Sequence, residues 1–152
     1  FGGEKFEGHW KFGKPWNGIW YDKDGDRIQT FSNGISNLLS TEYLDGFYVG
    51  ELHNHVPHGR GKWTNAEGDK YVGKWQNGRM HGRGTYVFLD THKYTGRFKD
   101  GRAHGRGALF LSNGARFDGV FRNGKKWWGT EFDKQGKMVA SFSDGKRHPK
   151  LY

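Results

Sequence analysis

Histidine and arginine residues recur at a fixed spacing in this sequence, and they are its first candidates for a chemical role. The recurring residues are His58, His81 and His104, each followed two positions later by Arg60, Arg83 and Arg106. A group of histidines can bind a metal ion, whereas a row of arginines can bind phosphate or carboxylate groups. Which of these roles is feasible depends on the elements that position the residues.

The sequence contains no recognisable set of catalytic residues. The acidic residues are scattered through expected turns, and no Ser, His and Asp residues share a recognisable motif. No glycine is followed by the Lys-Ser or Lys-Thr of a nucleotide-binding loop, and the absence of cysteine removes thiolate zinc sites and cysteine nucleophiles. We therefore expect no enzyme, no cofactor and no metal site.

The composition favours a β-structure stabilised by aromatic rings. Aromatic residues make up 17% of the 152 residues, which argues against disorder despite a mean hydropathy of -0.98. The chain has 26 glycines and only 3 prolines, which disfavours helices. No apolar run approaches the roughly 20 residues of a membrane-spanning helix.

A repeat of 23 residues is the dominant feature of the sequence. Its clearest copies are Tyr71, Gly73, Trp75, Gly78, His81, Gly82, Gly84 and Tyr94, Gly96, Phe98, Gly101, His104, Gly105, Gly107. Aromatic or Leu anchors recur along the whole chain at Trp10, Phe31, Leu52, Trp75, Phe98, Phe121 and Phe142. We therefore expect one array over residues 1–152, with six to seven repeats of 21–23 residues and no internal linker.

Each repeat has the pattern of a β-hairpin. Tyr71, Gly73 and Trp75 alternate with polar or small residues, as on one face of a strand. Asn77-Gly78 then predicts a tight turn, as Asn33-Gly34 does earlier, and a second strand is expected at 84–88. Single hairpins are unstable, so we expect the repeats to pair edge to edge into one continuous sheet, advancing about 10 Å per repeat.

The pattern Tyr-x-Gly-x-Trp-x-x-Gly-x-x-His-Gly-x-Gly at 71–84 resembles the MORN (membrane occupation and recognition nexus) repeat. Three central units, from Tyr48 to about Gly114, resemble it well, and the outer units resemble shorter variant MORN repeats. The sequence departs from the pattern at Leu52, at His55, after Gly124 and between residues 34 and 43, where Gly-x-Gly is missing.

The resemblance implies an all-β fold, an elongated single-layer antiparallel sheet of tandem β-hairpins with a groove lined partly by aromatic rings. It also implies a non-catalytic scaffold. Similar arrays bind peptides or helices, form end-to-end dimers, build cytoskeletal or axonemal assemblies, or adjoin lipid kinase domains, so an accessory role in a larger enzyme is one alternative.

The repeat geometry separates the histidines from one another. Equivalent residues of adjacent repeats are expected about 10 Å apart, whereas zinc requires nitrogens at about 2.0 to 2.1 Å. His58, His81 and His104 therefore cannot share one metal ion. We interpret each as a turn residue that forms a hydrogen bond within its own hairpin.

The aromatic residues outnumber those that a single-layer sheet is expected to bury. We therefore expect part of the aromatic ladder to form a groove for an apolar partner segment, in particular a helix, or for a neighbouring subunit. The candidate groove residues are Tyr48, Trp63, Tyr71, Trp75, Tyr86, Tyr94 and Phe98.

The net charge of +9 provides an alternative, which is binding to anionic phospholipid membranes. The candidate residues are Arg60, Arg83 and Arg106, with Arg79 and Arg102 on neighbouring turns, and we expect all five at one end of the hairpins. A further alternative is that charged turns only keep the array soluble. Nucleic acid is disfavoured because the rings are needed for packing.

The ends and the composition give weaker indications of context. The absence of cysteine is compatible with a reducing compartment, and we expect an intracellular, cytoplasmic or cytoskeletal protein. Because the sequence begins with Phe1 rather than Met, we expect a fragment or a processed product. The strand edge at the Phe1 end is expected to pair with another subunit or with further sequence, whereas Pro149 blocks the opposite edge.

Overall fold

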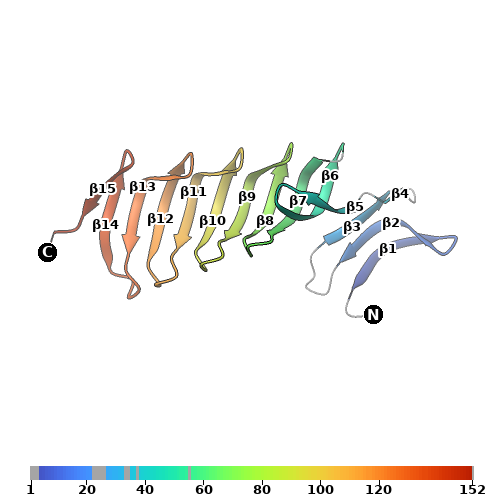
Figure 1. Ribbon diagram of the computed structural model, residues 1–152, viewed down its shortest axis with the longest axis horizontal. Helices are drawn as coiled ribbons and strands as arrows, with labels where there is room; N and C mark the ends of the chain where they lie inside the picture. Colours follow the sequence, from blue (N-terminus) through green and yellow to red (C-terminus); the bar gives the residue numbers. More distant parts are fainter. Residues whose placement is uncertain (1–3, 22–26, 33–34, 37, 55, 152) are drawn as a thin grey trace.

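The computed structural model describes residues 4–21, 27–32, 35–36, 38–54 and 56–151. Every regular element in these ranges is a β-strand, and successive strands lie side by side along the array (Figure 1). The predicted turn at Asn33-Gly34 and the departure at His55 lie outside the described residues. The prediction of an all-β array of tandem hairpins is confirmed.

The strands follow one another at short intervals. They are β1 (Lys5–Lys11), β2 (Lys14–Tyr21), β3 (Arg27–Ser32), β4 (Ile35–Ser36), β5 (Leu38–Tyr43), β6 (Gly46–His53), β7 (Val56–Asn65), β8 (Lys70–Gln76), β9 (Arg79–Val87), β10 (Lys93–Lys99), β11 (Arg102–Phe110), β12 (Arg116–Arg122), β13 (Lys125–Phe132), β14 (Met138–Ser143) and β15 (Lys146–Pro149).

Hydrogen bonding divides the described strands into two antiparallel sheets. Strands β1 to β4 form a four-stranded sheet and β5 to β15 an eleven-stranded sheet, each in sequence order. The expectation of one continuous sheet is corrected at this point. The division follows β4, a strand of only two residues, in the unit that lacks Gly-x-Gly, and β3 lies next to β5 and β6. The absence of a linker within 1–152 stays a prediction.

The tight turns have the backbone that the sequence predicts. Asn77 has a φ of 49° and Gly78 a φ of 76°, the left-handed pair of a two-residue hairpin turn. Asp100 and Asn123 have φ values of 50° and 49° at equivalent positions. The second strand starts directly after the turn, however, since β9 begins at Arg79 rather than at residue 84.

Adjacent hairpins are locked together at these turns. The N–H of Gly78 donates to the carbonyl oxygen of Pro57 at 2.8 Å, and Gly101 donates to Met80 at 2.9 Å. Each acceptor belongs to the preceding hairpin. The turns therefore lie in a row along one long edge of the sheet, the upper edge in Figure 1, and the longer loops lie along the opposite edge.

A row of paired glycines crosses the sheet and makes room for the aromatic rings. In register, it consists of Gly50, Gly61, Gly73, Gly84, Gly96, Gly107, Gly119 and Gly129. A Cβ atom at Gly84 would overlap the ring of Tyr71. The Tyr71 hydroxyl passes over the glycines and donates to the carbonyl oxygen of Lys74 at 2.9 Å.

The rings form one edge-to-face ladder. Its order is Tyr48, Trp75, Tyr71, Phe98, Tyr94, Phe121, Phe117 and Phe142, with successive ring centroids 4.8 to 5.3 Å apart. Each such pair contributes about 0.5 to 1.5 kcal/mol beyond its buried area. We call the side of the sheet with Tyr71 and Trp75 the inner face, and the side with Val72 and Lys74 the outer face.

The inner face curves around the ladder. Tyr48 and Tyr71 have an exposed fraction of 0% although the sheet is a single layer, which requires the strands to bend around them. Register shifts next to the glycine row, between Gly73 and Trp75 for example, are β-bulges that produce such bends. The aromatic ladder is therefore the core of the protein.

Candidate functional site

The predicted aromatic groove is filled by its own rings. Six of the seven candidate residues are buried, with exposed fractions from 0% for Tyr71 to 6% for Trp63 and Phe98, and Tyr86 is half-buried. Burial raises the pKa of the Tyr94 hydroxyl to about 12. The expectation of an exposed aromatic groove is corrected, because the curved sheet buries more ring surface than a flat one.

The outer face has a row of positive charges in the middle of the strands. We call it the basic row, and it consists of Arg60, Lys74, Arg83, Arg97 and Arg106 on the adjacent strands β7 to β11. Each residue is next to a glycine of the inner-face row and on its turn side, so side-chain alternation places all five on the outer face. All five are exposed. Four strand spacings make the row about 19 Å long.

The side chains of the basic row have no bonded anionic partner in the part of the chain that the structure describes. None of its five side chains forms an ion pair or hydrogen bond there, whereas Asp118 on the same face is bonded to Arg116 at 2.8 Å. Arg60 lies directly opposite Lys74, and Arg83 directly opposite Arg97. Like charges in direct cross-strand pairs are destabilising, so the row is not a device for stabilising the sheet.

A hollow of about 1020 Å³ lies beside the basic row on the outer face. Its lining includes the three arginines Arg83, Arg97 and Arg106 and the small or branched residues Val72, Thr85, Thr95, Ala108 and Val120, together with glycine backbone. The Thr85 and Thr95 hydroxyls are hydrogen-bonded to each other at 3.0 Å. The hollow therefore has a small, mainly neutral floor and a basic wall.

The two ends of the row differ in chemistry. On β6, the Glu51 side chain lies over Gly59, close to where the row begins. At the other end, Arg106 is paired with Val120, and Val120 with Trp128. Trp128 has an exposed fraction of 52%. The outer face thus changes from acidic through basic to apolar along the array.

The five arginines predicted as candidates for phospholipid binding lie at two separate sites. Arg60, Arg83 and Arg106 lie in mid-strand on the outer face, because the second strand of each hairpin begins directly after the turn. Arg79 and Arg102 lie at the turn edge, where they line a hollow of about 430 Å³ with Lys99, Asp100 and Asn123. The expectation that all five arginines lie at one end of the hairpins is therefore corrected.

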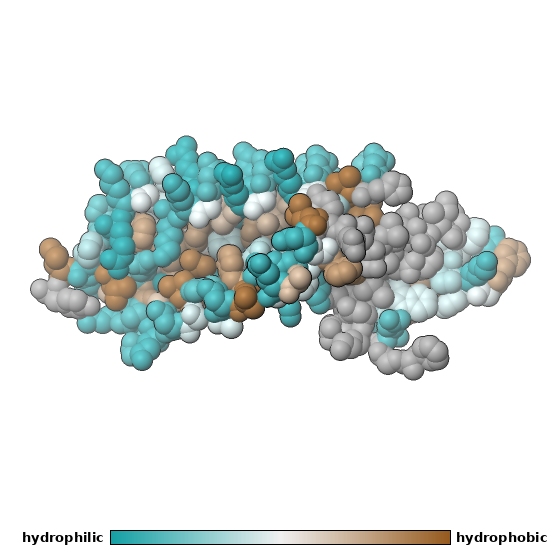
Figure 2. Space-filling view, in the orientation of Figure 1, coloured by the Kyte–Doolittle hydropathy of each residue, from teal (hydrophilic) through white to brown (hydrophobic). Residues whose placement is uncertain are grey.

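Hydrophilic side chains follow the upper edge of the array in Figure 2, where the tight turns lie. Apolar side chains gather nearer the opposite edge on the face shown. The basic residues of the turn edge therefore belong to a polar border, which differs from the surface beside the longer loops.

The recurring histidines lie in strands, and His58 and His104 connect neighbouring hairpins, whereas the buried Nδ1 atom of His81 has no hydrogen-bond partner in the described part of the chain. The Nδ1 atom of His58 accepts a hydrogen bond from the Asn77 N–H at 3.5 Å, and His104 accepts one from Asn123 at 3.4 Å. The interpretation as turn residues bonded within their own hairpin is corrected, because each donor belongs to the turn of the next hairpin. Among the described residues, no group of three His, Asp or Glu residues could hold a metal ion.

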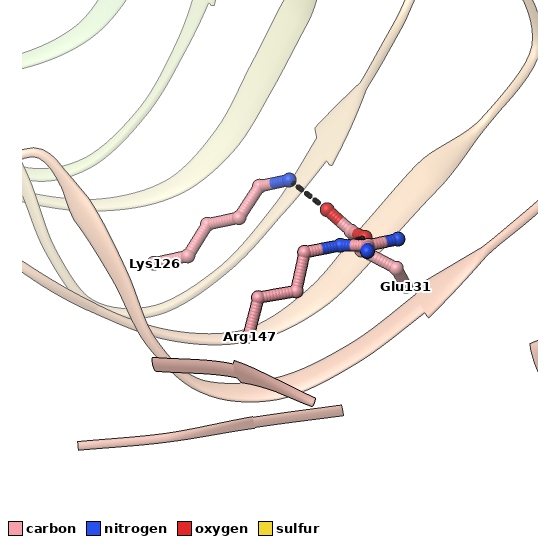
Figure 3. Close-up of polar contacts among 3 residues, drawn as sticks. All are labelled: Lys126, Glu131 and Arg147. Carbon is pink, nitrogen blue, oxygen red and sulfur yellow. Dashed lines mark hydrogen bonds and ion pairs between the residues drawn. The ribbon is translucent and has the colours of Figure 1, made fainter. Parts of the chain in front are cut away.

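An ion cluster closes the C-terminal end of the ladder (Figure 3). Lys126 and Arg147 converge on Glu131, with contacts of 2.5 and 2.7 Å to its two carboxylate oxygens. Burial raises the pKa of Glu131, but the two cations outweigh this effect and hold the pKa below its usual value. Lys126 also lies 5.1 Å from the centre of the Phe117 ring, so the cluster is part of the ladder's packing.

Two residues of the basic row, Lys74 and Arg97, were not identified by the repeat pattern. Equivalent positions hold Glu51 and Val120, so the residue type changes from repeat to repeat and shows no periodic signal. Strand alternation was the available signal, since each residue follows a glycine of the inner face.

The described part of the chain has no helix long and apolar enough to cross a membrane. No curated protein matches the sequence. A family model described as the MORN repeat matches residues 48–70, 71–90 and 94–116. MORN repeats generally take part in protein–protein or membrane phospholipid interactions and are typically non-catalytic binding modules. Because the three matches follow one another along consecutive hairpins, three tandem MORN repeats make up the central part of this chain.

Proposed function

We propose that the chain is a non-catalytic protein-interaction scaffold that binds an acidic partner along the basic row of its outer face. One observation supports this most directly, the row of five exposed cations on five adjacent strands with no anionic partner among the described residues. The aromatic ladder contributes rigidity to this surface, because its rings are buried on the opposite face.

The energetic cost of the row favours a binding role. Two unit charges 5 Å apart in water repel each other by about 0.8 kcal/mol. The row includes two directly opposed pairs, Arg60 with Lys74 and Arg83 with Arg97. A negatively charged partner would convert this repulsion into attraction, and the net charge of +9 would accelerate its approach.

A pair of charge reversals tests the proposal. The variant Arg83→Glu/Arg97→Glu changes the net charge by about -4, since each of two residues changes from +1 to -1. The control Lys125→Glu/Lys146→Glu makes the same change at exposed positions outside the row. In affinity capture from the native source, the first variant should lose the partners of the original chain and the control should keep them. Retention of the same partners by the first variant would refute the proposal.

The turn edge favours a second candidate function, contact with an anionic membrane. Arg79, Lys99 and Arg102 surround the smaller hollow, and basic residues near an anionic bilayer contribute about 1 kcal/mol each. Sedimentation with phosphatidylserine vesicles should then be lost at high salt and in the variant Arg79→Glu/Arg102→Glu. Sedimentation that depends on neither salt nor lipid charge would rule out this function.

A further inference from the structure

We propose that the partner of the basic row is an acidic amphipathic α-helix of about 19 residues, lying across the strands with one apolar residue against Trp128. This inference rests on the proposed function and specifies its partner. It follows from the charge, the spacing and the shape of the outer face.

The spacing of the cations fits a helix. Adjacent strands place them about 4.8 Å apart, and acidic residues at i, i+4 and i+7 follow one side of a helix with a pitch of about 5.4 Å. An extended peptide presents the same side only every 6.6 Å or so, and loses register within two or three strands. The row of about 19 Å corresponds to roughly 13 helical residues, and the two further strand spacings from Arg106 to Trp128 add about 10 Å, or roughly six residues.

The shape of the outer face disfavours a flat bilayer. The floor residues Thr85, Thr95 and Ala108 are short, while Arg83 and Arg97 stand along one side of the hollow of about 1020 Å³. A curved object such as a helix can place small side chains on this floor and acidic ones against the arginines. A planar surface would contact the arginines and leave the floor uncovered.

The surroundings of the row also disfavour a single-stranded nucleic acid. Such ligands need exposed rings on which successive bases stack. The basic row itself contains no aromatic residue, and Trp128 lies two strands beyond its end, past Val120. Trp128 can instead make a single anchoring contact, because its exposed fraction of 52% leaves surface for an apolar side chain.

The first experiment uses two synthetic peptides of identical composition. In the striped peptide, an alanine-based helix, glutamates occupy one face and a leucine follows two turns after the last of them. In the scrambled peptide the same glutamates are distributed around the helix. We expect fluorescence anisotropy to show at least tenfold tighter binding of the striped peptide to the full chain. Equal affinities would overturn the helix proposal, because a general polyanion site would not distinguish them.

The variants locate the site. Arg83→Glu/Arg97→Glu should weaken binding of the striped peptide at least 30-fold, from the loss of two attractions and the gain of two repulsions. The control Lys125→Glu/Lys146→Glu should stay within about threefold. Trp128→Ala should weaken binding of the striped peptide about tenfold but leave a peptide without leucine unaffected. Equal weakening of both peptides would overturn the anchor at Trp128.

Two further probes separate this inference from its alternatives. A single-stranded oligonucleotide or phosphatidylserine vesicles that bound more tightly than the striped peptide, and were lost in Arg83→Glu/Arg97→Glu, would overturn the acidic helix. If native partners depend on the basic row but the two peptides bind equally, the proposed function stands and the helix fails. If native partners do not depend on the row, both fail.

A single substitution excludes misfolding as the cause of lost binding. Arg97→Glu places a carboxylate directly opposite Arg83, so it removes one like-charge pair and creates an ion pair. We expect the Tm to stay equal or rise by about 2 °C while the affinity for the striped peptide falls about tenfold. A fall in Tm comparable to that of a core variant would overturn the assignment of Arg97 to an unpartnered outer row.

Discussion

The two faces of the same strands differ in how their residues vary from repeat to repeat. On the inner face, Tyr48, Tyr71 and Tyr94 occupy equivalent positions, all buried and each with its hydroxyl bonded to a carbonyl oxygen three residues later. On the outer face, equivalent positions hold Glu51, Lys74, Arg97 and Val120. Constancy thus marks the packing that joins the repeats, and variation marks the surface where chemistry can differ along the array.

Among variants that compare the two faces, removal of one inner-face ring should have the largest effect on the free energy of unfolding. Tyr71→Ala deletes a fully buried ring that contacts Trp75 and Phe98, and we expect it to lower the free energy of unfolding by about 4 kcal/mol. Val72→Ala, on the outer face of the same strand, should cost less than about 1 kcal/mol because Val72 is 45% exposed. Urea denaturation measures both. Similar costs at the two sites would contradict the division into a core face and a free face.

The addition of a single methyl group on the inner face should have an effect almost as large. Gly84→Ala places a Cβ where the Tyr71 ring lies, and we expect a loss of about 3 kcal/mol from overpacking. The neighbouring outer-face variant Thr85→Ala should lose only about 1 kcal/mol with its hydrogen bond to Thr95. If calorimetry showed Gly84→Ala to be neutral, the glycine row would not be needed to accommodate the ring.

These differences explain which features the sequence could predict. The tyrosine and glycine of Tyr71 and Gly73 recur in every central unit, with a large apolar residue at the position of Trp75, so the hairpin, its inner face and the Asn77 turn follow from the repeat alone. The acceptor role of His58 does not, because its donor is 19 residues away and becomes a neighbour only when two hairpins pair.

The site was harder to predict than the fold. Arg60, Arg83 and Arg106 were found as a periodic set, but their place in mid-strand depends on where the second strand begins. The depth of ring burial does not follow from the sequence, because bulges beside the glycines curve the sheet, and curvature is not visible in a pattern of alternation. The division after β4 likewise depends on pairing between strands rather than on any single residue.

The ion cluster at the end of the inner face should show a pH-dependent effect. The folded pKa of Glu131 is lowered, so its stabilising contribution is present above the ordinary value of 4.5 and is lost as the pH falls through the folded value. We expect Glu131→Gln to be about 1 kcal/mol less stable at pH 7 and equal to the original chain at pH 2. A difference that persists unchanged at low pH, in urea titrations, would show that the carboxylate charge is not the stabilising feature.

The smallest expected effect on stability has the opposite sign and lies on the outer face. Arg97→Glu should raise the free energy of unfolding by about 0.5 kcal/mol, because a cross-strand ion pair with Arg83 replaces a repulsion. The gain should shrink as salt screens the exposed pair, and the reversed variant Arg83→Glu should show the same gain. The two single-variant gains in the free energy of unfolding should not add. The double reversal restores a like-charge pair and should return the stability to that of the original chain. Urea titrations should therefore show a gain in each single variant and no change in the double variant, as expected for surface charges that repel each other. If the two arginines instead made core contacts, all three variants would be less stable than the original chain.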